Sequence, residues 1–222
     1  GKSTLGRCIA GLLAPDGGQI LFNGQERGAR PAPGRVQMVF QDPQASLNPR
    51  HTVGRSIMAG PLAQGMAPAR ARERAAELLR LVGLNPDAAE RYPHEFSGGQ
   101  RQRIGIARAL ASEPELIVAD EPVSALDVSV QAQVLDLFAS VRQQFHLSML
   151  FVTHDLRVAA QMCDRIAVMQ QGRIIECGSA AQVIRAPSQD YTRQLVQAVP
   201  DFASIVSGRA RLTGLAHMEA AA

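Results

Sequence analysis

Four residues at the start of the chain have the types and order needed to hold a phosphate group. Gly1, Lys2, Ser3 and Thr4 match the end of the pattern G-x-x-x-x-G-K-[ST], whose amides cradle phosphates and whose hydroxyl binds Mg²⁺. Lys2 is the only lysine among 23 lysines and arginines. The placement of the single lysine in this motif favours a site that requires the compact ammonium of lysine and not the planar guanidinium of arginine. The alternative is a chance occurrence of a short motif.

Two adjacent carboxylates, Asp120 and Glu121, follow a continuous apolar run at residues 116–119. Such a run is typical of a strand buried on both faces of a parallel sheet, and these sheets bind ligands at the carboxyl ends of their strands. One carboxylate there can hold Mg²⁺ and the next can orient and deprotonate a water, as phosphoryl transfer requires. The alternative is a pair of solvated acids at the end of a strand.

A serine and two glycines come shortly before a predicted helix at residues 104–111. Ser97 is a suitable N-cap, and Gly98 and Gly99 allow close approach of the backbone to an anion. The free amides at a helix N-terminus favour anion binding. Taken alone, this stretch is better interpreted as an ordinary Ser/Gly turn, and only its neighbouring motifs favour a site.

The elements that must position these residues alternate in type along the chain. Apolar runs predict strands at residues 19–24, 36–40, 116–119 and 149–152, and the second delivers Gln41 to its end. Helices are predicted at residues 5–13, 69–81, 130–145 and 156–162, and a hairpin at residues 165–176. This order predicts an α/β core with a parallel sheet, and the stretch from residue 43 to about 114 is predicted to be an inserted helical subdomain.

Composition restricts the class of protein. The chain has 222 residues, of which 46% are hydrophobic, so it can bury a substantial core. It contains no run of about 18 apolar residues that would span a bilayer. A net charge of +3 with only 4% aromatic residues and no tryptophan argues against nucleic acid as a partner. Cys8, Cys163 and Cys177 lack metal-ligand spacing and are predicted to be reduced thiols.

The motifs occur in a specific order. SGGQ at residues 97–100, DEP at residues 120–122, SALD at residues 124–127 and THD at residues 153–155 follow GKST. Their combination resembles the nucleotide-binding subunit of ATP-binding cassette (ABC) transporters, from Gly1 to about Pro187. The resemblance implies a P-loop NTPase core of the RecA type, with a small antiparallel β part and an inserted helical signature subdomain at about residues 44–112. It also implies ATP as the nucleotide and Mg²⁺ as the metal.

The resemblance further implies a role for each motif residue. Gly1, Lys2 and Thr4 would bind phosphate, and Ser3, Gln41 and Asp120 would serve the metal. Glu121 would be the general base, with Gln41 and His154 sensing the γ-phosphate. The remaining residues would act between two subunits. The signature motif, Ser97, Gly98, Gly99 and Gln100, would bind the nucleotide held by the opposing subunit. Asp127, in a loop, would link the two nucleotide sites.

Three stretches narrow the resemblance to the bacterial oligopeptide, dipeptide and nickel importer ATPases. They are residues 41–50, 121–131 and 186–195. The last departs from that family, because Gln189-Asp190-Tyr191 stands where His-Pro-Tyr is usual. The expected division is an ATPase domain at residues 1–186 and a C-terminal extension of the oligopeptide-transporter type at residues 187–222. Peptides, nickel and glutathione all stay open as solutes.

The implied function is an ATPase that powers import across the bacterial inner membrane, from its cytoplasmic face. Its implied partners are transmembrane permease subunits, a second ATPase subunit in a homodimer or heterodimer and, indirectly, a solute-binding protein. The first strand and most of the phosphate loop are expected to precede Gly1, so the chain is interpreted as a fragment. Two alternatives are a soluble ABC protein acting on DNA or ribosomes and a non-catalytic regulator.

Overall fold

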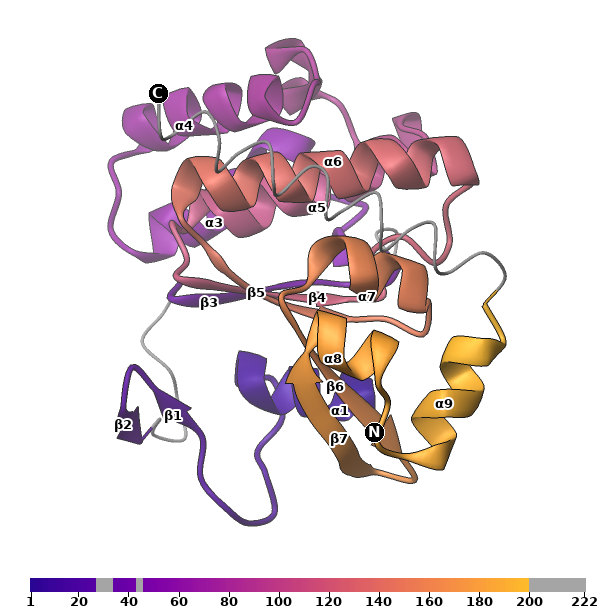
Figure 1. Ribbon diagram of the computed structural model, residues 1–222. Coiled ribbons are helices and arrows are strands. Elements are labelled where there is room, and N and C mark those ends of the chain that lie inside the picture. Colours follow the sequence, from indigo (N-terminus) through magenta and orange to yellow (C-terminus); the bar gives the residue numbers. More distant parts are fainter. Residues whose placement is uncertain (27–33, 43–45, 200–222) are drawn as a thin grey trace, which may run out of the picture. The chain divides into compact units, whose positions relative to one another are not determined.

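The computed structural model describes residues 1–26, 34–42 and 46–199 (Figure 1). The chain divides into two compact units, one formed by Ser3–Val152 and the other by Gly1–Lys2 together with Thr153 and the residues after it. Residues 43–45 of the predicted helical subdomain and residues 200–222 of the predicted extension lie outside the described residues.

A three-stranded parallel sheet lies at the centre of the Ser3–Val152 unit. Its strand order is β3 (Val36–Val39), β4 (Leu116–Asp120) and β5 (Ser148–Val152). Ile117, Val118 and Ala119 of the central strand are fully buried, as the continuous apolar run predicted. The α/β core with a parallel sheet is therefore confirmed, and all three strands end at the same edge of the sheet.

Helices cover both faces of this sheet (Figure 1). Helix α1 (Lys2–Ala10) packs on one face, where Ala10 joins a cluster with Val36, Met38 and Val118. Helices α5 (Gly98–Ala111) and α6 (Val128–Phe145) lie on the other face. The prediction of a helix at residues 5–13 placed α1 too late, because Gly11, at φ 73°, ends the helix in a left-handed conformation.

The stretch between β3 and β4 is helical, as predicted. It contains α3 (Val53–Ala63), α4 (Pro68–Leu81), the 3₁₀ turns η1 (Pro86–Glu90) and η2 (Pro93–Glu95), and α5. Leu78 and Leu79 of α4 are buried together with Ile57 of α3 and Ile104 of α5. The apolar faces of these helices therefore form a packed layer.

A short hairpin precedes the sheet. Strands β1 (Leu21–Phe22) and β2 (Gln25–Glu26) pair across Asn23 and Gly24, whose φ angles are 51° and 75°. These positive φ angles belong to the turn that Asn-Gly favours. The predicted strand at residues 19–24 is thus confirmed only for two residues, because its last two residues form the turn.

The other unit is built around an antiparallel hairpin of β6 (Arg165–Gln170) and β7 (Arg173–Ser179). Helices α7 (Leu156–Met162), α8 (Ala180–Arg185) and α9 (Asp190–Gln197) belong to the same unit. A buried cluster that includes Ile166, Val168 and Val183 joins the hairpin to α8, and Tyr191 and Leu195 of α9 pack against it. Among the helices of the described ranges, none combines the length and apolar character needed to cross a bilayer.

Candidate active site

The first turn of α1 and the end of β4 bring together two residues that are far apart in sequence. The Ser3 hydroxyl donates a hydrogen bond to Oδ1 of Asp120 at 2.9 Å. Asp120 is 4% exposed, so its carboxylate is held in a nearly dry position at the sheet edge. A hydroxyl and a carboxylate are hard oxygen ligands, which suit Mg²⁺ when a substrate phosphate and water complete its coordination. Thr4 follows on the same turn and is exposed.

Glu121 has an unusual backbone conformation. Its φ angle is 45°, in the left-handed region that residues other than glycine seldom adopt. Its N–H donates to the Val152 carbonyl at 2.8 Å. The N–H and Oγ of Ser124 donate to the Glu121 carbonyl at 3.2 Å and 3.0 Å. Neighbouring groups therefore hold both sides of this residue, which is how a strained conformation persists at a site.

Strand register places Gln41 and Glu121 at the same edge. Val39 pairs with Ala119 in the parallel ladder between β3 and β4. Gln41 lies two residues beyond Val39, and Glu121 lies two residues beyond Ala119. Gln41 is exposed. The structure therefore delivers this glutamine to the edge of the sheet that carries the two carboxylates.

The signature motif starts a helix. Ser97 is the N-cap of α5, and its Oγ accepts a hydrogen bond from the Gln100 N–H at 3.3 Å. In return, Oε1 of Gln100 accepts from the Ser97 N–H at 3.0 Å. This reciprocal capping box confirms the predicted N-cap. Because amides in the first turn of a helix have no partner within it, Gly98 and Gly99 present their N–H groups outward.

The two glycines pack against the start of α6. A Cβ on Gly99 would lie 2.4 Å from Cγ1 of Val130, so Val130 would have to shift to admit a side chain, whereas a Cβ on Gly98 would lie 3.7 Å from Leu126. Asp127 caps α6 by accepting from the Val130 N–H at 3.0 Å and from the Ser129 hydroxyl at 2.7 Å. These two hydrogen bonds lower the pKa of Asp127. The signature motif and the loop containing Asp127 are therefore neighbours within one chain.

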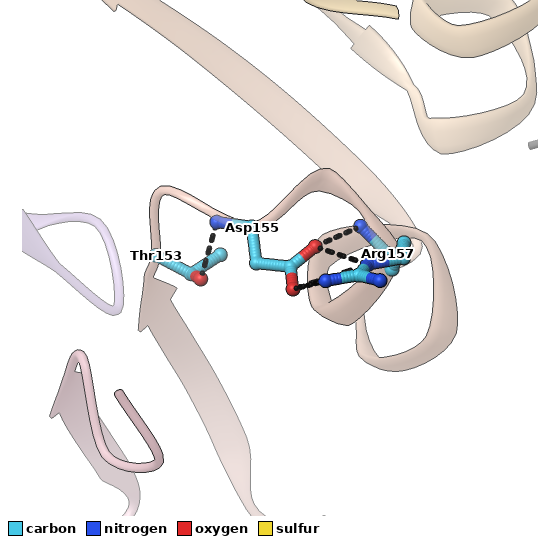
Figure 2. A network of polar contacts seen from close by, with 3 residues as sticks. All are labelled: Thr153, Asp155 and Arg157. Atoms are coloured by element: carbon cyan, nitrogen blue, oxygen red, sulfur yellow. Dashed lines mark hydrogen bonds and ion pairs between the residues drawn. The ribbon is translucent and has the colours of Figure 1, made fainter. Parts of the chain in front are cut away.

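His154 belongs to the other unit and lies between Thr153 and Asp155 in the sequence. Figure 2 shows the contacts of these two neighbours and Arg157. The Asp155 N–H donates to the Thr153 hydroxyl at 3.0 Å, and Asp155 caps α7 through the Arg157 N–H at 2.8 Å. The Arg157 guanidinium also binds this carboxylate. Burial acts to raise the pKa of Asp155, but its hydrogen bonds with Arg157 outweigh burial and the pKa is lowered. His154 itself is exposed.

The structure joins some of the predicted residues more directly than others. It bonds Ser3 to Asp120 and brings the strands before Gln41 and Glu121 into register. Gly1, which is exposed, and Lys2, which is half-buried, belong with His154 to the other unit. Sequence reasoning missed the part played by Ser124 in holding Glu121. A serine three residues after a strand-end acid, able to bond to nearby backbone, is the signal that could have indicated it.

Comparison with known proteins identifies the family of this chain. The family model described as ABC transporter matches residues 1–124. A peptide import ATP-binding protein of Brucella ovis is 50% identical over 207 residues, which are 90% of this chain and 65% of that protein. An oligopeptide transport ATP-binding protein of Bacillus subtilis is 51% identical over 209 residues, or 90% and 63% of the two chains. The chain thus spans less than two thirds of the length of these relatives.

Solved structures show the same fold. The structure of cbiO1 from Clostridium perfringens, part of the ABC transporter complex cbiONQ, superposes with a TM-score of 0.74 at 25% identity, over 93% of this chain and 83% of that one. A dimeric ATP-binding cassette bound to ADP and Pi in a post-hydrolysis state gives 0.71 at 28% identity, over 81% of each chain. The chain has the α/β fold of ABC ATPases, and it belongs to the ABC transporter family.

Proposed function

We propose that this chain is the ATP-binding and hydrolysing part of a transporter that imports peptides or a related small solute across the bacterial inner membrane, from its cytoplasmic face. The hydrogen bond between Ser3 and Asp120 carries this proposal. It joins the phosphate-loop serine to the acid at the end of β4, and the pair offers the oxygen ligands that Mg²⁺ prefers.

The residues divide the chemistry among them. Lys2 and the amides at the start of α1 receive phosphate oxygens, because a helix N-terminus attracts anions. Ser3, Asp120 and Gln41 would hold Mg²⁺, which would supply positive charge to neutralise the phosphate oxygens. Glu121 orients the attacking water and accepts its proton. Bonds to Val152 and Ser124 restrict the backbone of Glu121, which limits where its carboxylate can reach.

Relatives support the solute class and the partners. One is named for peptide import and another for oligopeptide transport. A third, a glutathione import ATP-binding protein of Shigella flexneri, is 49% identical over 208 residues, which are 90% of this chain and 33% of that protein. All three names specify short peptides or a compound made of amino acids. Two solved structures support the partners, because one is part of an ABC transporter complex and the other is dimeric. From these we infer transmembrane permease subunits and a second ATPase subunit as direct partners, with a solute-binding protein acting through the permease.

The test is Glu121→Gln in the full-length protein, because glutamine keeps the shape of the side chain and removes the base. ATP turnover should fall by roughly a hundredfold or more, with ATP still bound. Single-turnover hydrolysis and nucleotide retention measure the two effects. Glu113→Gln is the matched control. Glu113 also has a positive φ angle, 50°, but it lies before the start of β4, whereas Glu121 lies just after the end of β4. Unchanged turnover in Glu121→Gln would exclude the general-base role, and a wild type that binds no ATP would exclude the proposed function.

A further inference from the structure

Arg108 makes a contact between the signature helix and the segment after Gln41. It lies in the last turn of α5, and its Nη1 donates a hydrogen bond to the Ser46 carbonyl. The guanidinium is removed from most of its solvent, and this burial lowers its pKa from the ordinary value for arginine. Arginine stays charged even so, because its pKa is far above neutrality. The contact is therefore a charge-assisted hydrogen bond in a poorly solvated place, where such bonds are strong.

Ser46 is in turn connected to the residue beside Gln41. The Ser46 N–H donates to the carbonyl of Asp42, the residue after Gln41, at 3.2 Å. Leu47, the residue after Ser46, is 2% exposed and is anchored in the core. The Arg108 guanidinium thus holds Ser46, and Ser46 holds Asp42, one residue after the side chain expected to sense the nucleotide.

We propose that Arg108 is a positioning residue that ties the signature helix to Gln41, so that a displacement of either is transmitted to the other. This inference rests on the proposed function for its consequence in catalysis, and on the Ser46 contact for its physical basis. Removing the guanidinium takes the charged donor from the Ser46 carbonyl and so weakens the hold on Ser46, whose N–H is bonded to Asp42. Gln41 then occupies its working position for a smaller fraction of the time.

The same helix provides a matched control. Arg103 also donates to a backbone carbonyl, at 2.9 Å from Nη1 to Val82 O, and its Nη2 donates to Oε1 of Gln133 at 3.0 Å. These bonds join α5 to the end of α4 and to α6, and neither reaches Ser46 or Asp42. Arg103→Met and Arg108→Met therefore each remove one guanidinium from α5, but only the second removes the donor to the Ser46 carbonyl.

The kinetic test uses ATP turnover by the full-length protein. Arg108→Met should lower kcat by roughly tenfold with little change in KM, because a misplaced group costs rate more than binding. Arg108→Lys should recover part of this loss, since an ammonium can also donate to the Ser46 carbonyl. In a Gln41→Ala background, Arg108→Met should cause no further loss, which is the coupling expected of residues acting as one unit. Additive losses, or an equal fall in kcat for Arg103→Met, would overturn the inference.

A second measurement does not depend on catalysis. Hydrogen exchange at the Ser46 amide should be faster in Arg108→Met than in the wild type and unchanged in Arg103→Met. If the wild type hydrolyses no ATP, the proposed function fails, and the exchange measurement alone decides the Arg108 contact. Unchanged exchange at Ser46 in Arg108→Met would overturn the inference whatever the activity.

Discussion

Two glycines on α5 have opposite surroundings although they share one helix. Gly99 and Gly105 are both buried. A Cβ on Gly99 would lie 2.4 Å from Cγ1 of Val130, a distance that real Cβ contacts do not reach, whereas a Cβ on Gly105 would meet no atom within 4 Å. The first glycine is therefore needed for close packing of α5 on α6, and the second costs the helix stability without a packing benefit.

Alanine substitutions should separate these two cases by sign. Gly99→Ala should lower the free energy of unfolding by about 1–3 kcal/mol, because the added methyl forces α5 and α6 apart. Gly105→Ala should raise it by about 0.5–1 kcal/mol, because alanine favours the helix and finds space. Urea unfolding of both variants beside the wild type measures the difference. Stabilisation by Gly99→Ala would show that Val130 moves aside easily and that the glycine is not required for packing.

Residue types in the sequence predicted the cap of α5 but not the backbone conformation of Glu121. The Ser97 N-cap follows from a serine before a helical pattern, and the structure confirms it. The positive φ of Glu121 has no signal in the sequence, because it is imposed by bonds to Val152 and Ser124, which are 31 and three residues away. Asp127 was assigned to contact between subunits, and the structure shows in addition that it caps α6. Its role between subunits stays a prediction.

At the scale of elements, one carboxylate fastens helix α9 to the hairpin of its unit. Glu176 lies on β7 and accepts hydrogen bonds from the N–H groups of Ser188 at 2.8 Å and Gln189 at 3.2 Å, just before α9 begins. The Ser188 bond is the main reason that the pKa of Glu176 is lowered from 4.5 to about 2. A charge at this position also favours the N-terminus of a helix.

This lowered pKa gives the docking of α9 a defined pH dependence. Because the folded pKa is below the unfolded one, ionised Glu176 stabilises the docked helix fully above pH 4.5, and the stabilisation is lost as pH falls from 4.5 to about 2. Tyr191 lies on α9, and Tyr92 is the only other tyrosine in a chain without tryptophan. Tyr191 fluorescence in a Tyr92→Phe background therefore reports release of α9.

Glu176→Gln in the same background is the control for this titration. In this variant α9 should dock more weakly at neutral pH. Between pH 4.5 and 2, its docking should weaken only as far as protonation of the other carboxylates causes. Identical acid profiles for the two proteins would show that Glu176 does not fasten α9.

Elements with a buried apolar pattern were predicted well, whereas α8 and α9 were not predicted. Strands β4 and β5 and helix α6 have apolar patterns that follow from burial, so the sequence was sufficient to find them. Helices α8 and α9 have six and eight residues, which is too short for a helix to form by propensity alone. They form because Ser179 caps α8, Glu176 binds ahead of α9, and both helices pack on one apolar cluster. Such contacts cannot be found without the tertiary fold.

At the scale of the molecule, the proposed catalytic site needs two subunits. The signature motif begins α5, and Lys2 begins α1, so each chain offers one phosphate-binding segment and one signature segment. In a symmetric dimer, each ATP would lie between the Lys2 segment of one subunit and the signature segment of the other. A site assembled in this way can be tested by placing one defect in each segment and mixing the two variants.

Lys2→Ala and Gly98→Asp are the pair suited to this mixing experiment. Lys2→Ala removes a cation that binds phosphate, and Gly98→Asp places a negative charge where the opposing subunit's phosphate would lie. An aspartate at the start of α5 favours the helix electrostatically, and a Cβ at Gly98 lies at an ordinary contact distance of 3.7 Å from Leu126, so the fold should persist.

Each full-length variant alone should hydrolyse ATP poorly, because every site contains one defect. Mixed dimers contain one site in which both segments are intact, so mixing should restore part of the turnover. Gly98→Ala mixed with Lys2→Ala controls for the added volume without the charge. If mixed dimers form, as subunit exchange between labelled chains would show, and turnover does not recover, then both segments serve the same chain and the shared site is wrong.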